Sequence, residues 1–395
     1  MTAAYNSDVT VTVRFAYGQD VYDTTPTWTD ETSDVLGFTV RRGKNRRLDQ
    51  VQPGQATIRL LNTSGDYSPW NTAGANSPNV NVLTKVNIRA THNMVDYDLF
   101  TGYAVAWLNT WDHSGHYPIV EVQAVDGFTL LAMFEAELTE ATEMSGARVG
   151  NLLDTAGWPA AWRDLDAGTH NVAALSAEFD NILGELYRVA LVEDGLFWIA
   201  GNGDATFRDG VTRHNATVAA TLSDDGAGVD YRHVRVDYDT TQLWNSATVT
   251  RADGEPQTAT DATSVAAYGR RDLHLSETLN VADGEAQAFA DWLVAEFKDV
   301  RSRVPEVTLT PEKNPTVLWP EALGRELLDK VNAEVTTIAG DDFDEDCYIE
   351  GVAHNVNMVG TRFWETGFQL SPDLPFTDWW VLGVSELGVD TRLAY

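Results

Sequence analysis

The residues best placed to do chemistry are one pair of histidines and one acidic run. His113 and His116 lie three positions apart, a spacing that binds a metal ion only when further ligands are present. A serine and a glycine separate them and strand-like segments flank them, which is more typical of an exposed turn. The run 341–346 could hold a hard cation such as calcium, but it lacks the glycine and terminal glutamate of an EF-hand loop. We therefore expect solvated loops at both places.

Sequence patterns of common enzymes are absent. The chain has no Gly-x-Ser-x-Gly elbow, no His-Glu-x-x-His pair and no phosphate-binding Walker loop. The glycine-rich segment 201–204 joins two predicted strands, which indicates a hairpin turn. His354 shares a strand face with apolar residues, so we expect a packed, hydrogen-bonded histidine there. We predict a protein that is not an enzyme, with no catalytic residue, no cofactor and no metal.

One cluster of positive charge stands out. Five cations fall within seven residues, Arg41, Arg42, Lys44, Arg46 and Arg47, in a chain whose net charge is -32. No interleaved aromatic residues accompany them, which disfavours nucleic-acid binding. A basic strand edge facing an acidic neighbour, in the same chain or another subunit, fits better, and a solvated hairpin is the alternative. We take these five residues as candidates for a subunit interface.

Composition limits the class of protein. The 395 residues are 43% hydrophobic, enough for packed cores, and carry 59 acidic side chains against 27 lysines and arginines. This balance argues against a surface that neutralises nucleic-acid phosphates and against stable membrane association. A single cysteine, Cys347, excludes an intramolecular disulfide. The N-terminus lacks the pattern of a secretory signal, and no run of 18 apolar residues suggests a membrane span.

The elements expected from periodicity are mostly strands. Residues 1–130 alternate apolar and polar side chains over short stretches, as at 9–15 and 120–124, which is typical of a barrel or sandwich. Residues 131–228 contain helical spacing at 149–156 and 175–190 and a hairpin at 196–208. We predict a first β-barrel-like module followed by an α/β insert.

The β pattern returns in residues 229–374. One predicted helix interrupts it, with Asp283 as its expected N-cap and an apolar stripe that reaches Phe297. The fold class is therefore mainly β with an α/β insert (α+β), with two β-barrel-like modules. The apolar segment 375–395, which contains Trp379 and Trp380, either packs back as a strand or attaches to a neighbouring chain. We include both tryptophans among the candidate subunit-interface residues.

A set of short blocks, in this order, resembles tail proteins of long-tailed bacteriophages from GC-rich hosts. Each block alone is weak, but together they span roughly residues 10 to 372: 42–44, 54–57, 60–62, 65–69, 99–103, 125–127, 245–250, 264–271, 349–354 and 370–372. The resemblance is to the minor tail protein that serves as the baseplate or tail-tip hub. Such hubs are similar to the central hub of contractile phage tails.

The resemblance implies a structural role. Hubs of this kind have two β-barrel-like modules and assemble as homotrimers, so that six modules form a pseudo-sixfold ring. The implied partners are the sixfold distal tail protein ring, the C-terminus of the tape measure protein, the threefold central fibre or other tail-tip proteins, and genomic DNA only in passing through the channel. The implied location is the tail tip of the virion, assembled in the host cytoplasm. The segment 375–395 would attach a neighbouring tip protein.

Two alternatives remain open. The first is a hexameric distal tail protein, which differs from a hub in subunit number. The second, of another class, is an adsorption protein that binds or cleaves carbohydrate, because 13 tryptophans could build sugar platforms, although most are expected in cores or interfaces. Some hubs carry an added hydrolase domain, and we expect none after the block at 370–372.

Overall fold

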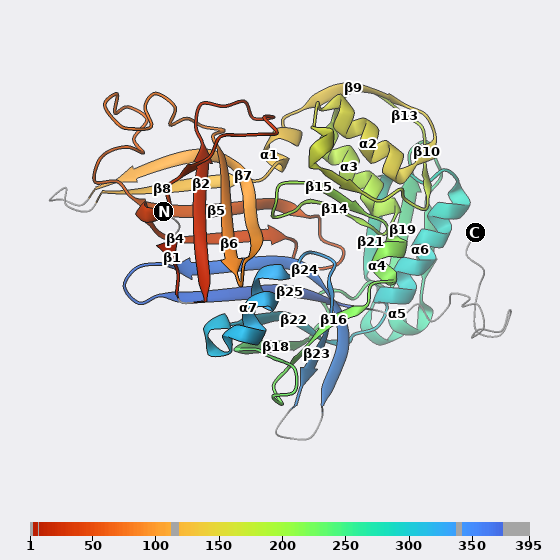
Figure 1. Ribbon diagram of the computed structural model, residues 1–395. Helices are drawn as coiled ribbons and strands as arrows, with labels where there is room; N and C mark the ends of the chain where they lie inside the picture. Colours follow the sequence, from red (N-terminus) through yellow and green to blue (C-terminus); the bar gives the residue numbers. More distant parts are fainter. Residues whose placement is uncertain (1–2, 7, 112–117, 337–341, 374–395) are drawn as a thin grey trace.

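The computed structural model describes residues 3–6, 8–111, 118–336 and 342–373. Its main feature is one 15-stranded sheet that runs through both halves of the chain (Figure 1). The sheet is built from β1 (Ala3–Ala4), β2 (Val9–Ala16), β3 (Thr29–Asp30), β4 (Val35–Gly43), β5 (Gln52–Leu61), β6 (Lys85–His92), β7 (Val95–Thr110), β8 (Ile119–Val125), β16 (Val218–Ser223), β17 (Val229–Asp230), β18 (His233–Tyr238), β22 (Ser302–Leu309), β23 (Lys330–Val335), β24 (Phe343–Asn357) and β25 (Phe363–Pro372).

The first half of the sheet follows directly from alternation in the sequence. In β2, Val9, Val11, Val13 and Phe15 are buried while the residues between them are half exposed, because successive side chains of a strand point to opposite faces. β2, β6, β7, β8, β5 and β4 pair antiparallel in that order. Their apolar faces form one core together with residues brought in by later parts of the chain.

β24 joins the two halves. Its later part pairs with β4, with Phe38 opposite Val356 and Val40 opposite His354, and its earlier part pairs with β23. β25 runs along β24 as its hairpin partner and pairs in turn with β22, which pairs with the edge strand β18. The hydrogen-bonded sheet is therefore continuous from the first half of the chain into the second.

The insert is a small α/β layer beside the sheet. It contains α1 (Phe128–Leu131), α2 (Ser145–Thr155), α3 (Ile182–Val192) and α4 (Gly210–His214), a short 3-10 turn (Ala160–Trp162), and the strands β9 (Glu135–Glu140), β10 (Glu143–Met144), β11 (Arg163–Leu165), β12 (Asn171–Val172), β13 (Leu175–Asn181), β14 (Leu196–Ile199) and β15 (Ala205–Arg208). The predicted hairpin at 196–208 is confirmed, since β14 and β15 pair antiparallel around the turn 201–204.

The predicted helix at 175–190 is half wrong. Its first part is the strand β13, which pairs with β9, and the helix α3 starts only at Ile182. The side chain of Asn181 caps this start by accepting a hydrogen bond from the amide nitrogen of Gly184 at 3.0 Å. Pairing with a strand from the beginning of the insert thus overrides the helical spacing of the apolar residues.

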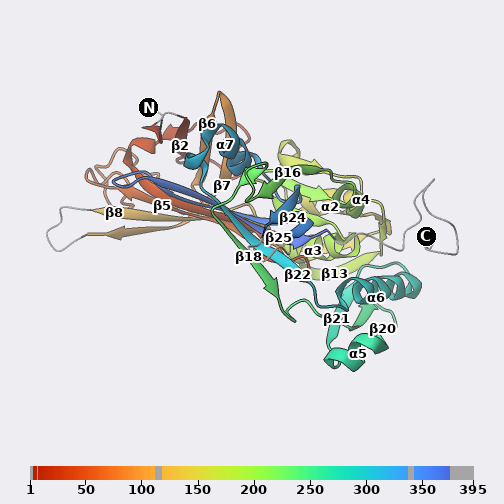
Figure 2. The same cartoon turned by 90° about the horizontal axis from the view of Figure 1, so that it is seen from below.

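A second small unit branches off the later half. The strands β19 (Ser246–Arg251), β20 (Gln257–Thr260) and β21 (Asp272–Thr278) form a sheet beside α5 (Ala262–Tyr268) and α6 (Asp283–Phe297), and Figure 2 shows the unit protruding from the body. The predicted helix at 283–297 is confirmed, although its N-cap is Ala282 and not Asp283. The unit has its own core, in which Val249 and Leu293 are fully buried.

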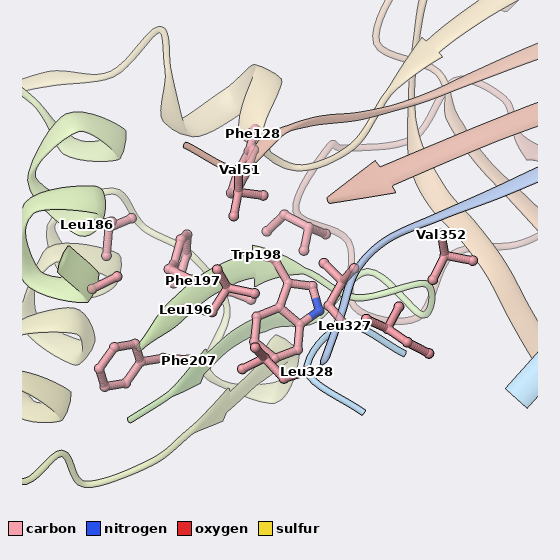
Figure 3. Close-up of a cluster of buried hydrophobic side chains, with 14 of the residues drawn as sticks. Val51, Phe128, Leu186, Leu196, Phe197, Trp198, Phe207, Leu327, Leu328 and Val352 are labelled. Carbon is pink, nitrogen blue, oxygen red and sulfur yellow. The ribbon is translucent and has the colours of Figure 1, made fainter. Parts of the chain in front are cut away.

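Three apolar clusters hold these parts together. The largest joins the insert to both halves of the sheet, and Figure 3 shows Val51 and Phe128, the insert residues Phe197 and Phe207, and Val352 of β24 around the same interior. The helix α7 (Pro315–Gly324), which follows a short 3-10 turn (Pro311–Lys313), covers the core of the first half. Another 3-10 turn, Thr32–Asp34, precedes β4.

Three aromatic rings fix α7 to the sheet. Trp319 meets Trp364 of β25 edge to face, with centroids 5.1 Å apart, and Tyr5 packs on both rings.

None of the helices in the described residues is long and apolar enough to cross a membrane. The predicted fold class, mainly β with an α/β insert, is confirmed.

Candidate functional site: a buried charge cluster between the sheet and the insert

The cationic segment lies at the end of β4 and in the turn that follows it. Arg42, Lys44 and Arg47 are buried, with 5–6% of each residue exposed, whereas Arg41 and Arg46 point to solvent. Arg41 and Arg42 are neighbours in β4 and therefore face opposite sides of the sheet, whereas Lys44, Arg46 and Arg47 lie in the turn that follows β4. The segment therefore sends three charges into the junction between the sheet and the insert.

Glu350 of β24 pairs with one of these inward charges, Lys44, and with Arg213 of the insert. Its Oε1 accepts a hydrogen bond from Nη2 of Arg213 in α4 at 2.7 Å, and its Oε2 lies 3.4 Å from Nζ of Lys44. Burial alone would raise the pKa of the Glu350 carboxyl, but the charges of Lys44, Arg213 and Arg47 outweigh burial and lower the pKa below its usual value. Lys44 also donates to the carbonyl oxygen of Arg47 at 2.6 Å, which fixes the turn.

Arg47 makes a second ion pair at the same junction. Its Nη2 lies 2.7 Å from Oδ2 of Asp194, at the turn after α3, and Nε2 of His214 is 3.1 Å from the same oxygen. Burial opposes ionisation of Asp194, yet Arg47, His214 and Arg213 hold its pKa well below the ordinary range. The guanidinium of Arg47 also lies over the ring of Trp292 in α6, 5.1 Å from its centroid. One side chain thus contacts the insert and the small protruding unit.

Arg42 contributes the third ion pair. Its Nη1 donates to both carboxylate oxygens of Glu326, at 2.7 and 2.9 Å, just after α7. The amide nitrogen of Gly201 donates to Oε2 of Glu326 at 3.4 Å, and the carbonyl of Gly201 accepts from Oγ1 of Thr101 in β7 at 2.9 Å. The predicted turn at 201–204 therefore contacts the outer face of the first-half sheet.

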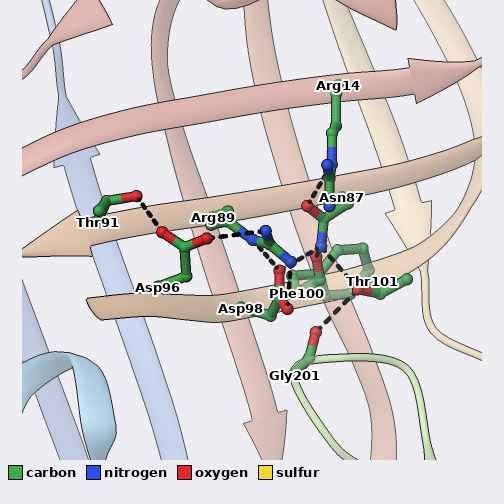
Figure 4. A network of polar contacts seen from close by, with 9 residues as sticks. All are labelled: Arg14, Asn87, Arg89, Thr91, Asp96, Asp98, Phe100, Thr101 and Gly201. Atoms are coloured by element: carbon green, nitrogen blue, oxygen red, sulfur yellow. Dashed lines mark hydrogen bonds and ion pairs between the residues drawn. The ribbon is translucent and has the colours of Figure 1, made fainter. Parts of the chain in front are cut away.

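A polar network on β6 and β7 continues from that contact. Asn87 donates through Nδ2 to Oγ1 of Thr101 and to Oδ1 of Asp98, and its Oδ1 accepts from Nε of Arg14 (Figure 4). Arg89 donates to both oxygens of Asp98. The network orders this face of the sheet where the insert turn lies against it.

These contacts locate the acidic neighbours of the cationic segment. For Arg42, Lys44 and Arg47 they belong to the same chain, which was one of the two readings of the sequence. Arg41, which donates to Oδ1 of Asn45 at 2.6 Å, and Arg46 are the exposed members of the set. The role of the five cations at a subunit interface stays a prediction. Trp379 and Trp380 lie outside the described residues.

The other sequence candidates are structural where they are described. The part of the acidic run at 342–346 opens β24, and Asp344 and Asp346 accept from Nδ2 of Asn332. No group of three or more His, Cys, Asp or Glu residues able to hold a metal ion occurs within the described residues. His113 and His116 lie outside them.

His354 is a packed, hydrogen-bonded histidine, as expected. Its Nδ1 lies 3.0 Å from Oγ1 of Thr366, and only 3% of the residue is exposed. Burial, helped by the nearby charge of Arg42, lowers the pKa of His354 to about 3. Burial likewise raises the pKa of the Cys347 thiol, which makes it a poor nucleophile. Neither residue has the exposure that a catalytic group needs.

The partners of the inward cations could not be found from sequence. Asp194 and Arg47 are 147 positions apart in the chain, and Arg213 and Glu350 are 137 positions apart. Glu350 is also one of 59 acidic side chains. Ion pairs between such distant segments leave no local pattern. Strand alternation could have separated only Arg41 from Arg42, because the other three cations follow β4 in a turn.

Comparison with known proteins identifies the fold. No family model matches the chain, and no curated protein matches it. The structure resembles a tail protein from Neisseria meningitidis MC58, with a TM-score of 0.61 at 11% identity over 91% of this chain and 96% of that one. It also resembles a 43 kDa tail protein of prophage MuSo2 from Shewanella oneidensis, with a TM-score of 0.58 at 13% identity over 91% and 97%. The resemblance read from the sequence is thus confirmed in the fold, and the chain has the fold of phage tail proteins.

Proposed function

We propose that this protein is a structural component of a phage tail tip, a trimeric hub. In this role it joins the sixfold tail tube and distal tail ring to the threefold central fibre and forms part of the DNA channel. The observation that carries the proposal is the mutual match: the shared fold covers 91% of this chain and 96% or more of each tail protein.

The internal organisation supports the symmetry part of the proposal. Residues 1–130 and 229–373 each supply strands to the continuous sheet; the predicted insert 131–228 adds one strand, β16, and its other elements lie beside the sheet. If each half acts as one barrel-like module, three chains offer six similar modules to a sixfold ring and three identical faces to a fibre. The ion pairs of Arg42 and Lys44 join the two halves, and those of Arg47 with Asp194 and of Arg213 with Glu350 join the insert to them.

The net negative charge of the protein is compatible with a channel for DNA. A net charge of -32 disfavours binding of DNA phosphates, so passing DNA would not adhere to the wall. Salt screens charges beyond roughly 8 Å, which limits this effect to close approach. The proposed partners are the distal tail protein ring, the tape measure C-terminus and the central fibre, with Arg41, Arg46, Trp379 and Trp380 as candidate contact residues.

Native mass measurement tests the proposal. One chain has a mass of 43.5 kDa, so a trimer should have three times and a hexamer six times this mass. Electron microscopy of assembled tail tips, with the protein located by symmetry, supplies the second measurement. A hexamer in either measurement would overturn the hub and favour the distal tail protein.

A further inference from the structure

Two large aromatic side chains lie exposed beside each other at one end of the molecule. Trp70 is 62% exposed and Trp111 is 51% exposed, and their ring centroids are 6.0 Å apart with an interplanar angle of 53°. Trp111 directly follows β7, whose hairpin with β8 projects from the body (Figures 1 and 2). Tryptophan is mostly buried in folded proteins, so an exposed pair of this kind indicates a binding surface.

Buried hydrogen bonds hold the pair in place. Nδ2 of Asn62 donates to Oγ of Ser68 at 2.9 Å, and that hydroxyl donates to Oδ1 of Asn109 at 2.8 Å. Asn62 and Ser68 are 3% and 6% exposed, and Asn109 precedes Trp111 by two residues. The turn that carries Trp70 is therefore fixed to the strand that leads to Trp111. Such preorganisation lowers the entropy lost when a ligand is bound.

The segment around Trp70 is polar and almost uncharged. Residues 62–76 contain asparagine, serine, threonine and glycine, and Asp66 is their single charged side chain. Thr63, Ser64 and Thr72 are exposed within it. Stable protein interfaces bury upwards of about 1,000 Å² with an apolar centre, which two rings in a polar segment do not supply. Each indole offers its own flat apolar face, in a segment with exposed hydroxyls, and such a face suits a sugar ring, which has an apolar C–H face and a hydroxyl rim.

We propose that Trp70 and Trp111 form a binding site for a neutral oligosaccharide, each indole stacking on the C–H face of one sugar ring. This goes beyond the hub role, because it gives the tail tip a direct contact with a glycan. The exposed hydroxyls of Thr63, Ser64 and Thr72 in the same segment are the candidates to bind the sugar hydroxyls at the edge of the stack.

Titration of the full-length protein with cellotetraose, maltotetraose and chitotetraose tests the site. We expect saturable binding of at least one of them by calorimetry, with a change in tryptophan fluorescence. Trp70→Ala and Trp111→Ala should each weaken the affinity at least about tenfold, and Trp70→Phe should keep part of it because a ring remains. Tyr238→Ala, which removes another exposed aromatic ring (69% exposed, on β18), is the matched control and should leave binding unchanged.

Two results would overturn the proposal. One is the absence of saturable binding to all three sugars by a protein with an unchanged melting temperature. The other is a change in native mass for Trp70→Ala or Trp111→Ala without any effect on sugar binding, which would make the pair a contact between proteins. The native mass of the unaltered protein tests the hub independently, so failure of either proposal is seen separately.

Discussion

Replacing Glu350 with glutamine tests the buried charge cluster most directly. Glutamine keeps the size of the side chain and an amide oxygen for Arg213, but it removes the negative charge that faces Lys44 and Arg213. All three side chains are at most 5% exposed, so water cannot replace the lost charge. Breaking a buried ion pair on one side costs about 3–5 kcal/mol.

This loss of unfolding free energy corresponds to a measurable fall in the melting temperature. At about 2.1 cal/mol/K per residue, unfolding of 395 residues carries an entropy of about 0.8 kcal/mol/K. Division of the cost by this entropy predicts a fall in Tm of about 4–6 °C for Glu350→Gln at pH 7, by differential scanning calorimetry. If a smaller part of the chain unfolds as the cooperative unit, the shift is larger.

A matched control separates burial from charge. Asp96→Asn removes a carboxylate that lies 3.1 Å from Arg89, but Asp96 is 52% exposed and Arg89 keeps Asp98 as a partner. Exposed pairs contribute about 0–1 kcal/mol, so this Tm should fall by about 1 °C or less. Equal shifts for the two variants would refute the reasoning. In the double variant Glu350→Gln/Arg213→Met, part of the lost stability should return. Arg213→Met removes one of the two positive charges that Glu350→Gln leaves without a negative partner.

Three further predictions concern the core, pH and assembly. Trp319→Ala should cost about 3–5 kcal/mol, because the ring is fully buried against Trp364, and an unchanged urea midpoint would contradict this packing. The folded state depresses the pKa of His354 to about 3, so its contribution to stability is complete above the ordinary value of 6.5 and is lost as pH falls toward 3. Between pH 7 and pH 5 this loss is about 2 kcal/mol. In urea melts, His354→Gln should lower the pH dependence by that amount, and an equal dependence in both proteins would contradict it. For the proposed interface, Arg41→Glu and Arg46→Glu should reduce the native mass from trimer toward monomer with Tm of the monomer unchanged, and a persistent trimer would remove both residues from the contact.

Local periodicity in the sequence predicted much of the fold. The hairpin at 196–208 and the helix at 283–297 follow from turn residues and apolar spacing, and both are present. The helix α7 was missed because Pro320 lies in its interior, where proline normally breaks a helix. Apolar spacing predicts a helix over β13, but this segment pairs with β9, and local spacing does not reveal that pairing. Local pattern thus predicts elements that local interactions stabilise.

The candidate site was only half predictable. The cluster of five cations is visible in the sequence, but which of them turn inward depends on the pairing of β4 with β5 and β24 and on the turn that follows β4. Their partners Asp194, Glu326 and Glu350 become neighbours only in the folded chain. The exposure of Trp70 and Trp111 was likewise hidden, since 13 tryptophans look alike in a sequence and most are expected to be buried.

The continuity of β24 has a mechanical consequence. A single backbone segment is hydrogen-bonded to β4 in one half and to β23 in the other, with β25 alongside. The two halves therefore have no flexible hinge between them at this strand, and sliding one past the other requires many peptide hydrogen bonds to break at once. The pairing of β24 therefore couples movement of one half to movement of the other.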